Sequence, residues 1–222
     1  MPSTTQIASV LAAVALGSVE AAMGPAFSTG PVSDNSWIRE ATSTLVLPKA
    51  PTGNNGDASL WVGMGTSNGD LIQSIAENWQ SDSWSVYAYT LTKTGDNSQL
   101  PVQGPSSDAS ASQHVTMHYK FDDASGNYTQ TVQVDGKTVS TLSTSSGHAQ
   151  GWGSSVECAE ENCGTVRAHS WINTKIILDS ADPDYINTMG KGDGVTGDMK
   201  TNDNGKTWIV EKIVIPEYSF SS

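Results

Sequence analysis

The chain has 222 residues, and its 11 Lys and Arg against 23 Asp and Glu give a formal net charge of -12. Nucleic acids and acidic polysaccharides are excluded as expected partners, because binding polyanions normally requires a concentrated basic patch. A chain of this length can form one β-sandwich or barrel with a full hydrophobic core.

The N-terminus carries an apolar run from Ile7 to Val19, followed by small residues at Ala21 and Ala22. This run is too short to cross a bilayer, and Val19 and Ala21 fit the small-x-small cleavage rule. We therefore expect a signal peptide at residues 1–21 and a single β-sandwich domain at 22–222. The protein should be secreted or reside in the lumen of the secretory pathway, with no membrane contact after cleavage.

The rest of the chain predicts strands and turns. Segments rich in Val, Ile, Thr, Tyr and Trp alternate with clusters of Gly, Asn, Asp, Ser and Pro, and no window has sustained helical periodicity. We expect an all-β fold, a two-sheet antiparallel sandwich of the jelly-roll or concanavalin type. Long loops are expected at 101–111 and 180–197. The predicted strands are 41–47, 59–64, 70–78, 83–92, 113–121, 128–134, 137–142, 165–178 and 207–215.

Alternation within two of these strands predicts which side chains share a face. In 113–121, Val115, Met117, Tyr119 and Phe121 should point toward the core. In 165–178, an apolar set that includes Ile172 and Ile176 should face the core. The opposite face would then present a polar and aromatic group that favours ligand binding, namely Arg167, His169, Trp171 and Asn173.

Cys158 and Cys163 are the only two cysteines, five positions apart. In an oxidising compartment we expect such a pair to close a small loop as a disulfide. Asn127 begins the only N-glycosylation sequon, Asn-Tyr-Thr, which predicts a surface turn there.

Three segments resemble the fungal glutamic peptidases, or eqolisins. Leu-Trp-Val-Gly-Met at 60–64, followed by Asp-Leu-Ile-Gln at 70–73, is similar to their Trp-Val-Gly-Ile and Leu-Gln signature. Ser-Thr-Leu-Val-Leu-Pro at 43–48 resembles their apolar strand ending at a Pro. Cys-Gly-Thr at 163–165 with Ala-His-Ser-Trp-Ile at 168–172 looks like their Cys-x-Thr-x-Ala-Glu-Trp-Ile block.

This resemblance implies a β-sandwich whose catalytic Gln and Glu lie on a concave sheet, with the Gln at Gln73. The position of the Glu falls at His169 or Ser170. An imidazole or a hydroxyl cannot replace a carboxyl in moving a proton to the leaving amine at acid pH, so the resemblance implies a relative without peptidase activity.

The sequence thus predicts a cleft on the concave sheet. We expect Gln73 and His169 to be catalytic. We expect the ligand-binding side chains to be Trp61, Tyr87, His118, Arg167, Trp171 and Asn173. No metal or cofactor is expected, because His114 and His118 stand about 13 Å apart on one strand and cannot share an ion.

Three functions remain open for such a cleft. The first is a non-proteolytic enzyme that holds a small, uncharged, partly apolar molecule and promotes a cyclisation without a cofactor. In size and signal peptide the chain resembles the hetero-Diels-Alderases of fungal secondary metabolism. The second is a glycan-binding lectin or a polysaccharide lyase. The third is an acid glutamic endopeptidase in which Glu77 or Glu211 supplies the acid. The oligomeric state is left open.

Overall fold

The computed structural model describes residues 21–96, 98–160 and 162–220, and the predicted signal peptide lies almost wholly outside them. Nearly all regular structure in these ranges is β, as predicted. Apart from one short 3-10 helix, η1 (Pro183–Thr188), the elements are β1 (Ala22–Met23), β2 (Phe27–Thr29), β3 (Ile38–Val46), β4 (Asp57–Thr66), β5 (Leu71–Trp79), β6 (Trp84–Gly95), β7 (Ser98–Gln103), β8 (Ser107–Ala109), β9 (His114–Asp122), β10 (Asn127–Val134), β11 (Lys137–Thr144), β12 (Ala149–Cys158), β13 (Thr165–Val166), β14 (His169–Leu178), β15 (Gly190–Lys191), β16 (Met199–Lys200), β17 (Thr207–Ile215) and β18 (Tyr218–Ser219). No helix within the described ranges is long and apolar enough to span a membrane.

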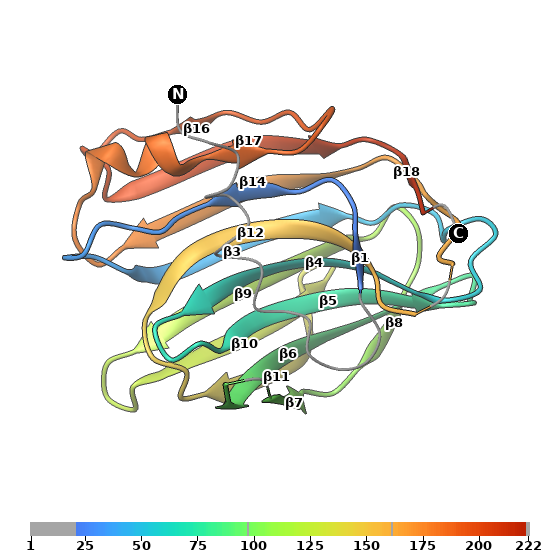
Figure 1. Cartoon of the computed structure of the whole chain (residues 1–222), viewed down its shortest axis with the longest axis horizontal. Coiled ribbons are helices and arrows are strands. Elements are labelled where there is room, and N and C mark those ends of the chain that lie inside the picture. The colour runs from blue at the N-terminus through green and yellow to red at the C-terminus, as the bar shows by residue number, and fades with distance from the viewer. Residues whose placement is uncertain (1–20, 97, 161, 221–222) are drawn as a thin grey trace.

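The strands form two antiparallel layers that run close to the long axis of the molecule (Figure 1). One layer, which we call the cleft sheet, has the order β2-β12-β4-β5-β6-β7. The other has the order β17-β14-β3-β9-β10-β11. A pairing between Ala149 and Ile38 joins the layers at one corner. The predicted two-sheet sandwich is confirmed.

The hydrophobic core lies between the two layers, and buried polar groups link them. Tyr119 on β9 is fully buried; its hydroxyl donates to the carbonyl oxygen of Val62 at 2.6 Å and accepts from the Ser74 amide at 2.8 Å. Gln130 on β10 donates to the Tyr89 carbonyl at 2.9 Å. These bonds hold β4, β5 and β6 on the core side of the cleft sheet, because buried polar groups are stable only where they are paired. The predicted core face of 113–121 is confirmed, with Phe121 partly buried at its end.

Several predicted boundaries differ from the structure. The segment 101–111, expected to be a loop, contains the end of β7 and all of β8, and 180–197 contains η1 and β15. None of the predicted strands covers β12, which lies between β2 and β4. Its backbone is held by ladders on both sides, and this pairing forms a strand where local propensity is low.

The expected faces of the segment 165–178 are correct at Val166, Thr174 and Ile176, which are buried, and wrong at residues 168–172. Asn173 has a φ of 55°, and the register of β14 against β3 shifts between Ile172 and Lys175. Such a bulge inserts an extra residue and exchanges the faces of the strand. As a result Trp171 is fully buried in the core and Ile172 is only partly buried.

The predicted disulfide between Cys158 and Cys163 is present, with an S–S distance of 2.03 Å and a Cα–Cα distance of 5.7 Å. It closes a short loop directly after β12. The bond therefore anchors the end of the strand that carries Glu157.

Candidate functional site

The outward side of the cleft sheet, which we call the cleft face, is organised in three rows of side chains that cross the strands. Direct antiparallel partners share a face, so the pairing register defines each row. The amide row contains Gly153, Gly63, Gln73, Tyr89 and Gln103; the apolar row contains Ser155, Trp61, Ile75 and Tyr87; the acid row contains Glu157, Ser59, Glu77 and Ser85.

A hollow of about 240 Å³ lies over these rows. Trp61, Ile75 and Tyr87 form a cluster of their own, apart from the main core, and Tyr89 packs against it. The hollow therefore has an aromatic middle between two polar edges. It is lined by Asp57, Ser59, Trp61, Gln73, Ile75, Glu77, Tyr87, Tyr89, Leu91, Gln103, Glu157 and Ala159.

Aromatic side chains of the apolar row hold the carboxyls of the acid row. The Trp61 indole donates from Nε1 to Glu157 Oε2 at 2.7 Å, and the Tyr87 hydroxyl donates to Glu77 Oε1 at 3.0 Å. Burial raises the pKa of Glu157 despite the indole hydrogen bond. Burial, together with the nearby charge of Glu77, raises the pKa of Tyr87 above its usual range, so this phenol stays a donor.

Asp57 stands beside the acid row, two residues before Ser59 on β4. Burial raises its pKa to about 7, helped by the charge of Glu77, a hydrogen bond shared with Glu77 and the charge of Glu157. Carboxyls this close cannot all ionise, because like charges in a partly dry site repel. Asp57 consequently keeps its proton up to about neutral pH.

Two buried acceptors on this face have no hydrogen-bond partner among the described residues. Gln73 is 4% exposed, and neither its Oε1 nor Asp57 Oδ1 accepts a hydrogen bond from a described residue. Gly63 makes the position of Gln73 possible, since a Cβ at residue 63 would lie 2.9 Å from the Gln73 Cβ and 2.8 Å from the Ile72 carbonyl oxygen. An unpaired buried acceptor costs free energy that a ligand can recover by supplying a donor.

The charge of the hollow limits its chemistry. No Lys, Arg or His is among its lining residues, and the described part of the chain contains no group of three or more His, Cys, Asp or Glu arranged to hold a metal ion. Hydrogen bonding and proton transfer by neutral or ionised carboxyls are the chemistry that these side chains can provide.

Of the residues predicted for the site, Trp61, Gln73 and Tyr87 come together in the hollow. His118 lies on the other sheet, where Nε2 is 2.9 Å from Glu40 Oε1. Arg167 is exposed and forms an ion pair with Glu217 at 3.0 Å. These two side chains are thus engaged elsewhere on the surface.

The prediction that His169 and Trp171 border the same cleft as Gln73 is wrong. Trp171 packs in the main core, and His169 is buried on the same strand face, with Nδ1 3.0 Å from the Arg167 carbonyl oxygen. Burial lowers the pKa of His169 to about 4. Asn173 is exposed at the bulge. The bulge is the physical reason, because it reverses the alternation on which the prediction depended.

Asn127 begins β10, and its side-chain amide donates to Ser143 Oγ at 3.3 Å. Its glycosylation stays a prediction.

The acidic part of the site was not predicted from the sequence. Alternation from Gln73 leads to Ile75 and Glu77, and alternation from Trp61 leads back to Ser59 and Asp57, so this signal was present. Glu77 was considered only as a replacement acid. Glu157 could not be found in this way because its strand had not been recognised.

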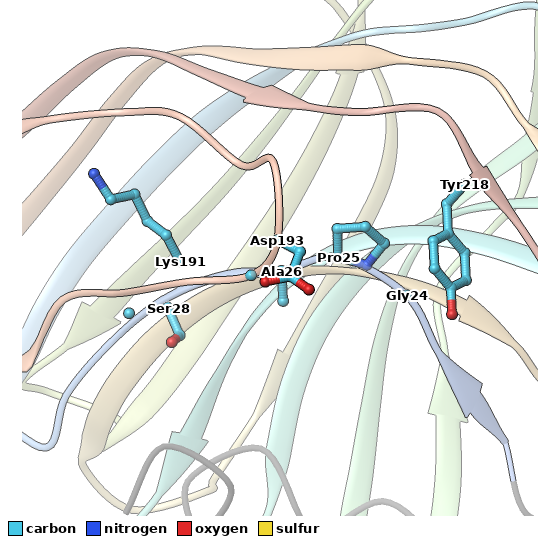
Figure 2. A pocket seen from close by; sticks show the side chains of 9 residues that line it. Gly24, Pro25, Ala26, Ser28, Lys191, Asp193 and Tyr218 are labelled. Atoms are coloured by element: carbon cyan, nitrogen blue, oxygen red, sulfur yellow. The ribbon is translucent and has the colours of Figure 1, made fainter. Parts of the chain in front are cut away.

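A second hollow, of about 330 Å³, lies at the edge of the same sheet beside β2 and β15. Figure 2 shows Tyr218 over Gly24 at one end and Lys191 near Ser28 at the other. Lys191 Nζ already donates to the Gly197 carbonyl at 3.2 Å and lies 3.8 Å from Asp198. This hollow has no buried polar atom without a partner, so the first hollow is the better candidate site.

No protein-family model and no curated protein sequence matches the chain. Several solved structures do match the chain. A scytalido-glutamic peptidase with a peptide-based transition-state analogue superposes with a TM-score of 0.53 at 12% identity, over 87% of this chain and 99% of that chain. SCP-B, a member of the eqolisin family in complex with the tripeptide Ala-Ile-His, gives 0.50 at 12% identity with the same coverage. The chain therefore has an eqolisin-like β-sandwich fold.

Proposed function

We propose that the hollow on the cleft face binds a small, uncharged, partly apolar molecule and promotes a cyclisation within it. The observation that carries the proposal is the pair of buried, unpartnered acceptors, Gln73 Oε1 and Asp57 Oδ1, at the two edges of an aromatic-lined hollow. A ligand that fills the aromatic middle and pairs with both polar ends would recover the free energy that the unpartnered acceptors cost. The disulfide supports a secreted protein, because such bonds persist in oxidising compartments.

A cyclisation of the hetero-Diels-Alder type suits these side chains. In this step two σ bonds form at the expense of two π bonds, and no atom, proton or electron leaves the reactants. The protein must only hold the reacting ends together and polarise one carbonyl. The neutral carboxyl of Asp57 supplies a hydrogen-bond donor for that oxygen, and the Gln73 amide orients the opposite end.

The proposal can be tested with benzamide as a neutral probe, because its amide group both donates and accepts and does not titrate between pH 5 and 9. The indole resonance of Trp61 in ¹H–¹⁵N spectra reports binding beside Glu157. We expect this resonance to shift on titration and the affinity to fall as the pH rises through about 7, where Asp57 ionises. In Asp57→Asn the affinity should no longer change with pH.

Asp108→Asn is the matched control, since Asp108 is exposed on β8 and does not line the hollow. It should behave like the unmodified protein. A Trp61 resonance that benzamide does not shift at any pH would refute the proposed site.

A second candidate, acid endopeptidase activity, is favoured by one observation. Glu77 lies on the same strand face as Gln73, so the cleft face does hold a carboxyl that could act with this amide. Glu211 is exposed on β17 of the other layer and does not line the hollow. If the cleft is non-proteolytic, denatured casein should stay intact at pH 3. Cleavage that disappears in both Glu77→Gln and Gln73→Ala would instead establish the peptidase.

A further inference from the structure

Trp79 differs from the other tryptophans of the chain. It is 52% exposed, whereas the remaining six are at most 9% exposed. It ends β5 and follows Gln73, Ile75 and Glu77 on the same face. Its direct partner on β4 is Asp57, which lines the hollow.

Exposure along this strand face shows where the hollow opens. It rises from 4% at Gln73 and 7% at Ile75 to 52% at Trp79. Along β5 the hollow is therefore most open beyond the acid row, next to Trp79 and Asp57, and we call this side its mouth.

A second exposed apolar side chain lies at the other end of the acid row. Met23 on β1 pairs directly with Glu157, the first residue of the acid row, and is 43% exposed. The described residues contain four large apolar side chains with such exposure, and the others, Leu100 and Ile209, lie on β7 and β17. Half of them thus flank the carboxyls, and exposed apolar groups beside a polar site are typical of binding surfaces.

The turn that carries Trp79 is held by hydrogen bonds. The Asn78 amide donates to the carbonyl oxygens of Ser81 at 2.7 Å and Ser83 at 2.8 Å. The Asn54 amide donates to the Asn78 carbonyl and to its Oδ1, at 3.0 and 2.9 Å. The indole is consequently presented by an ordered backbone, so little ordering entropy is lost when a ring stacks on it.

We propose that Trp79 forms an outer subsite for a ring of the ligand, while the polar group of the ligand reaches Asp57. The inference rests on the proposed function and specifies its ligand: an uncharged molecule with at least two linked rings, one inside the hollow and one at its mouth. The Trp79 indole stacks on the outer ring. A compact single-ring molecule would leave this subsite empty.

The test compares benzamide, which has one ring, with biphenyl-4-carboxamide, which has two, by following the indole resonances of Trp61 and Trp79. In the unmodified protein the two-ring probe should bind more tightly and shift both resonances, whereas benzamide should shift mainly that of Trp61. The advantage of the second ring should be about fivefold, as expected for one aromatic stacking contact.

Trp79→Ala should remove this advantage and leave benzamide affinity unchanged. Trp79→Phe should keep part of it. Leu100→Ala is the matched control, because Leu100 is 57% exposed at a distant edge of the same sheet, and it should keep the whole advantage. An undiminished advantage in Trp79→Ala overturns the outer subsite while the proposed function stands. A Trp61 resonance that neither probe shifts overturns both.

Discussion

Replacing Asp57 by Asn should stabilise the protein at pH 8 and leave its stability unchanged at pH 3.5. The pKa of Asp57 is raised from 3.8 to about 7 in the folded protein by burial and by the neighbouring carboxyls of Glu77, Glu157 and Glu160. A raised folded pKa contributes stability that is fully present below pH 3.8 and is lost as the pH rises through about 7. Asn has no charge to bury at either pH, so the variant avoids this loss.

The size of the effect follows from the shift. A change of about three pKa units corresponds to at most ~4 kcal/mol, and the partial exposure of Asp57 reduces this to about 1–2 kcal/mol through solvent screening. For a protein of this length that raises Tm at pH 8 by about 4 °C. Thermal unfolding followed by circular dichroism at both pH values measures it, with Asp108→Asn as the control. An equal change in Tm at pH 3.5 and pH 8 would refute the reasoning.

Three further predictions concern the framework of the cleft. Trp61→Phe removes the only indole donor to Glu157 and should lower the free energy of unfolding in urea at pH 7 by about 1–3 kcal/mol, whereas a change below 0.5 kcal/mol would show that water replaces the bond. Gly63→Ala places a methyl group 2.9 Å from the Gln73 Cβ. This substitution should lower the free energy of unfolding by about 1–3 kcal/mol and weaken benzamide binding. Unchanged binding would mean that Gln73 is not part of the site. Reduction of the 158–163 disulfide should add the mass of two hydrogens to the protein. It should lower the free energy of unfolding by less than the ~3 kcal/mol expected for a disulfide that closes a 15-residue loop. A larger decrease, measured by urea unfolding, would contradict a local role for this bond.

The sequence was sufficient for the fold class and for one edge of the site. Strands with many β-branched and aromatic residues, such as β4, β5 and β9, were predicted close to their observed bounds, because local propensity and pairing agree there. The position of Gln73 followed from a family resemblance, and the structure places it with Trp61 and Tyr87 in one hollow.

The strand β12 could not be predicted from its own residues. It contains Gly151, Gly153, Ser154 and Ser155, which carry little strand propensity. It is a strand because β4 pairs with it on one side and β1 and β2 on the other. Long-range pairing of this kind leaves no pattern in the local sequence. Because β12 was not predicted, the position of Glu157 in the site was not predicted either.

The faces of β14 were mispredicted for a different reason. Strict alternation was assumed, but Asn173 adopts a left-handed backbone conformation and adds a bulge. Asn tolerates that conformation better than most residues, but an Asn within a predicted strand is not sufficient to predict a bulge. A slip of one residue was enough to place Trp171 in the core instead of the cleft.

The central claim is that the cleft face holds an uncharged carboxyl next to a ligand site at mildly acid pH. The most direct test is a titration of the Asp57 side chain by ¹³C NMR, using protein labelled at the Asp carboxyls and Asp57→Asn to assign the resonance. We expect this carboxyl to titrate at about 7. An Asp57 resonance that titrates near 4, as a solvated carboxyl would, contradicts it.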